Sequence, residues 1–212
     1  MKSNEHVWHR EVLGPEVECT LRDLKALGFL ERYYLARGTA LALHLGHRRS
    51  QDLDFFSPYP VEPEGLIRTL KSLTGFGLAS QAPGTLHATV QGIKVSFLAY
   101  PYPALFPLAT LLGANVADPR DIACMKLSAI ASRGTKRDFV DLYFMARQHG
   151  LSQLLEWFNH KYADVNQNAI HVLKSLAYFE DADQEPMPHM LVQLSWGEVR
   201  RYFAREVSRS FP

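Results

Sequence analysis

The proline-rich segment at residues 100–107 (YPYPALFP) separates two parts of the sequence with different patterns, and this division limits the available folds more than any other feature. Before it, short apolar runs of strand length are separated by glycine and proline turns. After it, apolar residues recur at helical spacing along most of the chain. A chain in which strands are followed by helices is expected to form an α+β fold. Here we expect a small mixed β-sheet core with flanking helices and a helical C-terminal half.

We therefore predict two regions, an α/β core over residues 1–115 and a helical region over residues 116–212 that packs on the core. In the core, strands are expected at residues 33–36, 52–56, 77–80, 85–91 and 93–100, and helices at residues 20–33, 39–45 and 64–73. Gln91 and Gly92 suit a hairpin turn between the last two strands. In the second region, helices are expected at residues 119–132, 136–148, 151–162, 167–179 and 196–208, with an acidic linker at residues 180–188.

The composition is that of an ordinary globular protein and excludes several other classes. Of the 212 residues, 47% are hydrophobic and 21% are charged, so the chain is not a disordered one. A net charge of +1 argues against a protein that coats nucleic acid by bulk electrostatics. Cys19 and Cys124 lack the spacing of a zinc site. No apolar stretch is long and uninterrupted enough to span a membrane, so we expect a cytoplasmic protein without a membrane partner.

Two aspartates within residues 52–56 (DLDFF) form the first candidate site. On a strand, Asp52 and Asp54 point to one face, while Leu53 and Phe55 point to the other face and into the core. The Cα atoms of the aspartates are then about 6.6 Å apart. Carboxylate oxygens, together with nucleotide phosphates, are the ligands that Mg²⁺ prefers. The alternative is a solvated strand face, which is the usual role of an isolated Asp-x-Asp pair.

Gly38 and Thr39 stand between a short strand and the helix expected at residues 39–45. A glycine at this place lets the backbone approach a ligand. The N-terminus of the following helix offers N–H groups and a partial positive charge to a phosphate. Arg49 and Ser50, shortly before Asp52, are further candidate phosphate contacts. The alternative is that Gly38 and Thr39 only cap the helix and that Ser50 only shapes a turn.

A third group of candidates lies in the helical region. Lys126 falls on an otherwise apolar helical face, so its ammonium either reaches the edge of the packing or meets an anion. In residues 134–143 (GTKRDFVDLY), Lys136 is followed by Asp138 and Asp141, which share one helix face. The alternative role of these aspartates is to stabilise the helix N-terminus. We expect the Lys126 ammonium near Asp52 or Asp54, or near Asp138 and Asp141. Replacement of Lys126 by methionine is expected to change stability by less than about 1.5 kcal/mol.

Together these motifs resemble the AbiEii/AbiGii toxin family of nucleotidyltransferase-like proteins. Members of that family typically read G-G-T-A-L and then H-R-x-S-x-D-x-D-F-F, which correspond here to residues 37–41 (RGTAL) and 47–56 (HRRSQDLDFF). The similarity continues through residues 93–103 and 121–144. It implies a nucleotidyltransferase-like fold and an enzyme that transfers a nucleotidyl group from GTP or ATP with Mg²⁺ as cofactor. It also implies the toxin component of a toxin–antitoxin system.

The resemblance also implies roles for the candidate residues. Asp52 and Asp54 would hold Mg²⁺ and, with Lys126, form the catalytic set. The nucleotide would be bound by Gly38, Thr39, Arg49, Ser50, Lys136, Asp138 and Asp141. Related toxins modify the acceptor ends of tRNA, so tRNA or another RNA is the expected acceptor. A cognate antitoxin is the expected protein partner.

The sequence departs from the family pattern at two positions. Arg37 replaces the first glycine of the Gly-Gly step. Many nucleotidyltransferases carry a third carboxylate on a later strand, but the corresponding residues 94–97 (KVSF) offer Ser96. A serine is a poor Mg²⁺ ligand and cannot act as a base at neutral pH without help. Two alternatives therefore stay open: a catalytically degenerate nucleotide-binding or regulatory module with the same fold, and a structural or antitoxin-binding protein without a nucleotide site.

Overall fold

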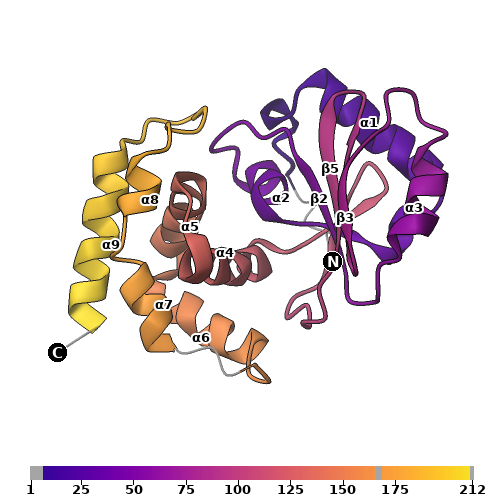
Figure 1. Cartoon of the computed structure of the whole chain (residues 1–212). Helices are drawn as coiled ribbons and strands as arrows, with labels where there is room; N and C mark the ends of the chain where they lie inside the picture. The colour runs from indigo at the N-terminus through magenta and orange to yellow at the C-terminus, as the bar shows by residue number, and fades with distance from the viewer. Residues whose placement is uncertain (1–6, 166–168, 211–212) are drawn as a thin grey trace, which may run out of the picture. The chain divides into compact units, whose positions relative to one another are not determined.

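The computed structural model describes residues 7–165 and 169–210, and the chain divides into two compact units (Figure 1). The first unit extends to Pro103 and includes Pro107–Asp118, while the second includes Ala104–Phe106 and the described residues from Pro119 onward. The sequence placed this boundary between residues 115 and 116. In the structure it lies between residues 118 and 119, because Pro119 begins the first long helix of the second unit, a position where its missing N–H costs nothing.

The first unit is built on a seven-stranded mixed sheet with the strand order β3-β4-β5-β2-β1-β7-β6. The strands are β1 (Tyr34–Leu35), β2 (Leu53–Ser57), β3 (Gly77–Ala82), β4 (Thr85–Val90), β5 (Ile93–Ala99), β6 (Ala109–Leu111) and β7 (Ala114–Val116). β2 is parallel to β5 and β1 is parallel to β7, whereas the other neighbouring strands are antiparallel. The predicted α+β class with a mixed sheet is thereby confirmed.

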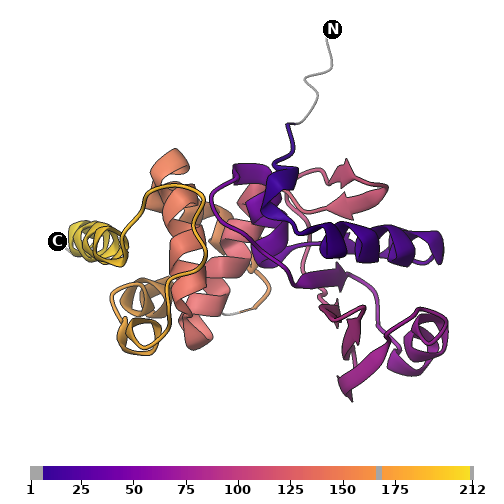
Figure 2. The same cartoon turned by 90° about the horizontal axis from the view of Figure 1, so that it is seen from above.

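Both faces of this sheet carry buried apolar residues, and the face that contains Phe55 and Phe97 is covered by helices. The helices of the unit are α1 (Pro15–Ala26), α2 (Arg37–Leu45) and α3 (Pro63–Leu70), with short 3-10 turns at Arg10–Val12 and Leu30–Arg32. α1 and α3 lie on the same side of the sheet (Figures 1 and 2). Beneath them, Phe55 of β2 stacks on Phe97 of β5 with ring centroids 5.3 Å apart. Because side chains alternate along a strand, the residues next to Phe55 in β2 and next to Phe97 in β5 point to the opposite face.

The described part of the second unit is helical. Its helices are α4 (Pro119–Arg133), α5 (Lys136–His149), α6 (Leu151–Lys161), α7 (Ala169–Ser175), α8 (Glu180–Asp183) and α9 (Trp196–Ser210). The ring of Phe139 on α5 lies within 6 Å of the rings of Phe179, Trp196 and Phe203, which ties α5 to the α8–α9 segment. None of the described helices in either unit is long and apolar enough to cross a membrane.

The structure differs from the predicted elements in several places. The helix expected at residues 20–33 is α1, which begins at Pro15 and ends before Gly28, whose φ of 77° stops it. The hairpin of β6 and β7 was not predicted, because each strand has only three residues. Part of the expected linker at residues 180–188 forms α8. Of the helix expected at residues 167–179, positions 167 and 168 lie outside the described residues.

Candidate functional site

Asp54 lies in β2 on the face of the sheet opposite to α1 and α3. Its neighbours Leu53 and Phe55 are almost completely buried, whereas Asp54 is half-buried. Among residues 7–165 and 169–210, the Asp54 carboxylate has no hydrogen-bond or ion-pair partner. Asp52 directly precedes β2 and is also half-buried, so both aspartates follow the alternation that the sequence predicts. A carboxylate that is partly desolvated and has no protein partner is suited to an external cation.

The N-terminus of α2 lies beside this strand. The backbone N–H of Ala36 donates to the carbonyl oxygen of Asp54 over 3.0 Å, and α2 begins at the next residue. Gly38 is therefore inside the first turn of α2, not before the helix as the sequence suggested. The first N–H groups of a helix have no partner within the helix, so this turn has donors for an anion. Arg37 directs its guanidinium over the ring of Phe56, 5.2 Å from the centroid.

The hydroxyl groups of Thr39 and Ser50 are engaged with the chain itself. Thr39 is buried, and its hydroxyl donates to the carbonyl oxygen of Asp52. The same hydroxyl lies 2.7 Å from the Ser50 hydroxyl, which therefore serves as the donor of that pair. These contacts hold the segment before β2 against α2 and so fix the backbone position of Asp52. Arg49, in contrast, is exposed.

Ser96 lies directly beside Asp54 in the sheet. The parallel pairing of β2 with β5 sets Asp54 opposite Ser96, so Ser96 occupies the place expected for a third carboxylate. On its other side, β4 sets His87 opposite Ser96, and the His87 Nδ1 atom lies 3.0 Å from the Ser96 hydroxyl oxygen. His87 was not among the predicted site residues. The signal for it was present, because a two-residue turn at Gln91 and Gly92 makes residues 87 and 96 cross-strand partners.

In the second unit, Lys126 meets the aspartates of α5. Its ammonium nitrogen lies 2.8 Å from Asp138 Oδ1 and 2.6 Å from Asp141 Oδ2. Lys126 is 5% exposed and Asp141 is fully buried, so this cluster is largely shielded from water. Burial on its own raises the pKa of Asp138, but the Lys126 charge and hydrogen bonds from Lys126 and Thr135 outweigh burial and hold that pKa below its ordinary value. The Asp138 carboxylate is thus held in its charged form beside the Lys126 ammonium.

Lys136 is also engaged within the second unit. Its backbone N–H donates to Glu185 Oε2 over 2.9 Å, and its ammonium donates to the Glu185 carbonyl oxygen. The ammonium also lies 5.1 Å from the centroid of the Trp196 ring. Lys136 is only 6% exposed. These contacts hold the chain after α8 against the start of α5.

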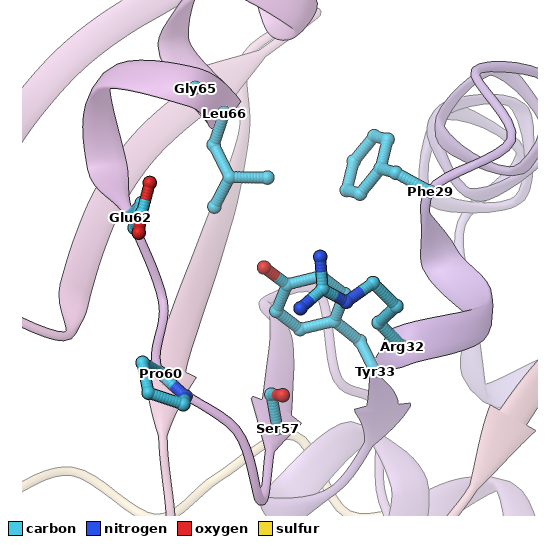
Figure 3. Close-up of a pocket in the computed structure, with 8 residues that line it drawn as sticks. All are labelled: Phe29, Arg32, Tyr33, Ser57, Pro60, Glu62, Gly65 and Leu66. Atoms are coloured by element: carbon cyan, nitrogen blue, oxygen red, sulfur yellow. The ribbon is translucent and has the colours of Figure 1, made fainter.

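A pocket of about 410 Å³ in the first unit lies away from the aspartates. It is lined by Phe29, Arg32, Tyr33, Ser57, Pro60, Glu62, Gly65 and Leu66. Figure 3 shows the side chains of Phe29, Tyr33 and Leu66 around a common space. Ser57 is three residues beyond Asp54 in β2 and therefore points to the opposite face. The pocket is thus on the α1–α3 side of the sheet.

The donor set of the aspartate pair fits Mg²⁺. The ion takes hard oxygen ligands, and in nucleotide-dependent enzymes one or two carboxylates suffice because phosphates and water complete the coordination. Within the described ranges, no group of three or more His, Cys, Asp or Glu side chains is arranged to hold a metal on its own. Asp52 and Asp54 are the residues of this pair that could contribute carboxylate oxygens to such an ion.

Comparison with known proteins connects this arrangement to a family. Residues 20–210 match the family described as nucleotidyl transferase AbiEii toxin of the type IV TA system. The uncharacterized protein aq_aa25 of Aquifex aeolicus (strain VF5) is 39% identical over 201 residues, which cover 92% of this chain and 96% of that protein.

Two solved structures share the fold. JHP933 from Helicobacter pylori has a TM-score of 0.55 and 16% identity, covering 93% of this chain and 92% of that chain. The nucleotidyltransferase toxin MenT4 from Mycobacterium tuberculosis has a TM-score of 0.53 and 17% identity, and the match covers 92% of this chain and 86% of that chain. The chain therefore belongs to the AbiEii family of nucleotidyl transferase toxins of type IV toxin–antitoxin systems.

Proposed function

We propose that this protein transfers a nucleotidyl group from GTP or ATP to the acceptor end of tRNA or to another RNA, with Mg²⁺ as cofactor. The reaction would take place in the cytoplasm and be restrained by a cognate antitoxin. One observation carries the proposal: the partly buried Asp54 carboxylate has no partner among the described residues and lies in the strand next to the N-terminus of α2. A carboxylate for a metal and a helix N-terminus for a phosphate are the two parts that nucleotidyl transfer needs.

Each residue has a proposed part in this reaction. Asp52 and Asp54 hold Mg²⁺, which when bound offsets the negative charge of the phosphates. The first turn of α2, at Gly38, receives phosphate oxygens through its backbone N–H groups. Thr39 and Ser50 act indirectly, because their hydroxyls hold the backbone at Asp52.

The remaining predicted residues have separate proposed parts. Lys126, with Asp138 and Asp141, is proposed as a phosphate-contacting group because the family motif covers these positions and the ammonium lies within 3 Å of both carboxylates. Arg49 is exposed, and its guanidinium is proposed to contact phosphate or RNA. For Lys136 the contacts with Glu185 favour a supporting role over direct contact with the nucleotide.

The double variant Asp52→Asn with Asp54→Asn tests the proposal. Two neighbouring carboxylates repel one another until a cation arrives, so the variant should fold with unchanged or slightly higher stability. Calorimetric titration with GTP and ATP should show binding by the wild type in the presence of Mg²⁺ and none by the variant. A radiolabel-transfer assay on total RNA should show labelled RNA only with the wild type.

Asp164→Asn, an exposed aspartate of the second unit, provides the matched control and should behave like the wild type. Binding of nucleotide without transfer to any acceptor would favour the alternative of a non-catalytic nucleotide-binding module, for which Ser96 at the third-carboxylate position is the specific argument. No binding of either nucleotide would refute the proposal.

A further inference from the structure

The row of side chains that contains Asp54 continues across two more strands. Asp54 of β2 pairs with Ser96 of β5, and Ser96 pairs with His87 of β4. Residues paired in register across neighbouring strands point to the same face of a sheet, with Cβ atoms about 5 Å apart. Asp54, Ser96 and His87 therefore form one continuous polar row. All three are half-buried on the face opposite to Phe55 and Phe97.

Within this row, Ser96 and His87 are in hydrogen-bond contact. The distance of 3.0 Å between His87 Nδ1 and Ser96 Oγ is within the range typical of a hydroxyl and the base that activates it. The His87 ring has no other hydrogen-bond or ion-pair partner among residues 7–165 and 169–210. The histidine is therefore committed to the serine, and its second ring nitrogen is available to exchange a proton with water.

We infer that Ser96 and His87 together replace the missing third carboxylate as the base of the nucleotidyl transfer, an inference that rests on the proposed function. A serine alone cannot accept a proton at neutral pH, but a serine that passes its own proton to imidazole can. Ser96 Oγ accepts the proton of the acceptor hydroxyl while its own proton passes to Nδ1 of neutral His87. The acceptor oxygen then bonds to the α-phosphorus, the bond from that phosphorus to the β-phosphate oxygen breaks, and pyrophosphate leaves.

The surroundings of His87 are consistent with this role. Across β4 from Ser96, the row ends at Ser80 of the edge strand β3, which is exposed. The charged groups that face the row are Asp54 on β2, one strand beyond Ser96, and Lys94 on β5, which pairs with Thr89 one row away. No ion pair of the His87 ring with either group occurs in the described part of the chain.

Three variants and two controls test the inference in the full chain. His87→Gln keeps a hydrogen-bonding partner for Ser96 but cannot take up the proton, and Ser96→Ala removes the relay. Each should lower kcat for transfer to RNA by about 100-fold or more, with nucleotide affinity unchanged. The decisive variant combines His87→Gln with Ser96→Asp, because an aspartate at position 96 supplies a carboxylate base beside Asp54. It should recover most of the lost rate.

The pH profile distinguishes a proton acceptor from a structural contact. In the wild type, kcat should fall on acidification, because protonated imidazole cannot accept another proton. In the rescued double variant this decline should move to lower pH, since a carboxylate stays ionised in more acidic solution. Ser80→Ala, the serine on the other side of His87, and His160→Gln, an exposed histidine of α6, are the controls and should keep both rate and profile.

Three results would overturn the inference, and they differ in what else they affect. If the wild type labels RNA and His87→Gln does so with the same kcat and pH profile, the relay is refuted while the proposed function stands. If the wild type labels no RNA, the proposed function and the relay fail together. A loss of activity in His87→Gln that Ser96→Asp does not restore, in a variant with unchanged melting temperature, would also count against the relay.

Discussion

Arg37, the first residue of α2, has a strained backbone conformation. Its φ of 58° lies in the left-handed region, which a residue with a side chain occupies only at a cost of about 1–2 kcal/mol. The family pattern has a glycine at this position, and the backbone explains why, since glycine pays no such cost. In this chain the guanidinium lies over Phe56, a contact that returns about 0.5–1 kcal/mol at an exposed site.

This balance predicts different outcomes for two small replacements. Arg37→Gly loses the contact with Phe56 but releases the backbone, so its free energy of unfolding should stay within about 1 kcal/mol of the wild type. Arg37→Ala loses the contact and keeps the strain, and should be less stable than Arg37→Gly by about 1 kcal/mol. Urea unfolding followed by circular dichroism measures both. Equal stability of the two variants would show that position 37 carries no strain.

At the scale of secondary-structure elements, the start of α5 positions several of the candidate residues. Thr135 and Asp138 form a capping box, in which the threonine hydroxyl accepts from the Asp138 N–H and the Asp138 carboxylate accepts from the Thr135 N–H. The same carboxylate accepts from Lys126 on α4. The helix cap and the ion pair therefore share one side chain, which fixes the ammonium relative to the start of α5.

This arrangement revises the stability expected for Lys126→Met. The sequence predicted a loss of stability below about 1.5 kcal/mol. The variant, however, would remove the cation that lies 2.8 Å from Asp138 and 2.6 Å from the fully buried Asp141. Breaking a buried pair in this way costs roughly 3–5 kcal/mol. Because the pKa of Asp138 is lowered in the folded protein, the pair contributes stability above about pH 4, the ordinary aspartate value, and loses it as the pH falls through the lower folded value.

Stability measured by urea unfolding between pH 3 and pH 7 tests this expectation. The difference between wild type and Lys126→Met should be large near neutral pH and shrink in acid, where protonated aspartates no longer need the lysine. Adding Asp141→Asn to Lys126→Met should recover part of the loss at pH 7. A difference below about 1.5 kcal/mol at pH 7 would restore the original expectation.

The features that could be predicted from the sequence are those that depend on a local pattern of residues. The hairpin turn at Gln91 and Gly92 was predicted, and its two positive φ values of 53° and 80° are those of the expected turn. For the Lys126 ammonium, the sequence left two pairs of aspartates open as neighbours, and the structure has Asp138 and Asp141 beside it. The contact of Thr39 with the Asp52 carbonyl could not be predicted, because it depends on the path of the loop after α2. Glu185 as partner of Lys136 lies far along the chain and leaves no periodic signal.

At the scale of the whole molecule, the chain passes between the two units more than once. It leaves the first unit after Pro103, contributes Ala104–Phe106 to the second, and returns to form the β6–β7 hairpin before Pro119. Asp121 explains why the short middle segment belongs to the helical unit. Its carboxylate accepts from the backbone N–H groups of Leu105 and Phe106 over 3.1 and 3.0 Å, and from the Lys161 ammonium over 2.7 Å.

Asp121→Asn therefore should loosen one unit and not the other. An amide can still accept a hydrogen bond, but the substitution removes the negative charge that lies 2.7 Å from the Lys161 ammonium, which is 3% exposed. Hydrogen exchange followed by mass spectrometry should show faster exchange at Leu105 and Phe106 and in α4 and α6, since local stability there depends on this pair. Amides of β4 and β5 should exchange as in the wild type.

Asp164→Asn, on the surface of the second unit, is the control and should change exchange in neither unit. Equal acceleration in both units would mean that Asp121 supports the molecule as one cooperative body, and unchanged exchange at Leu105 and Phe106 would remove its role as their anchor.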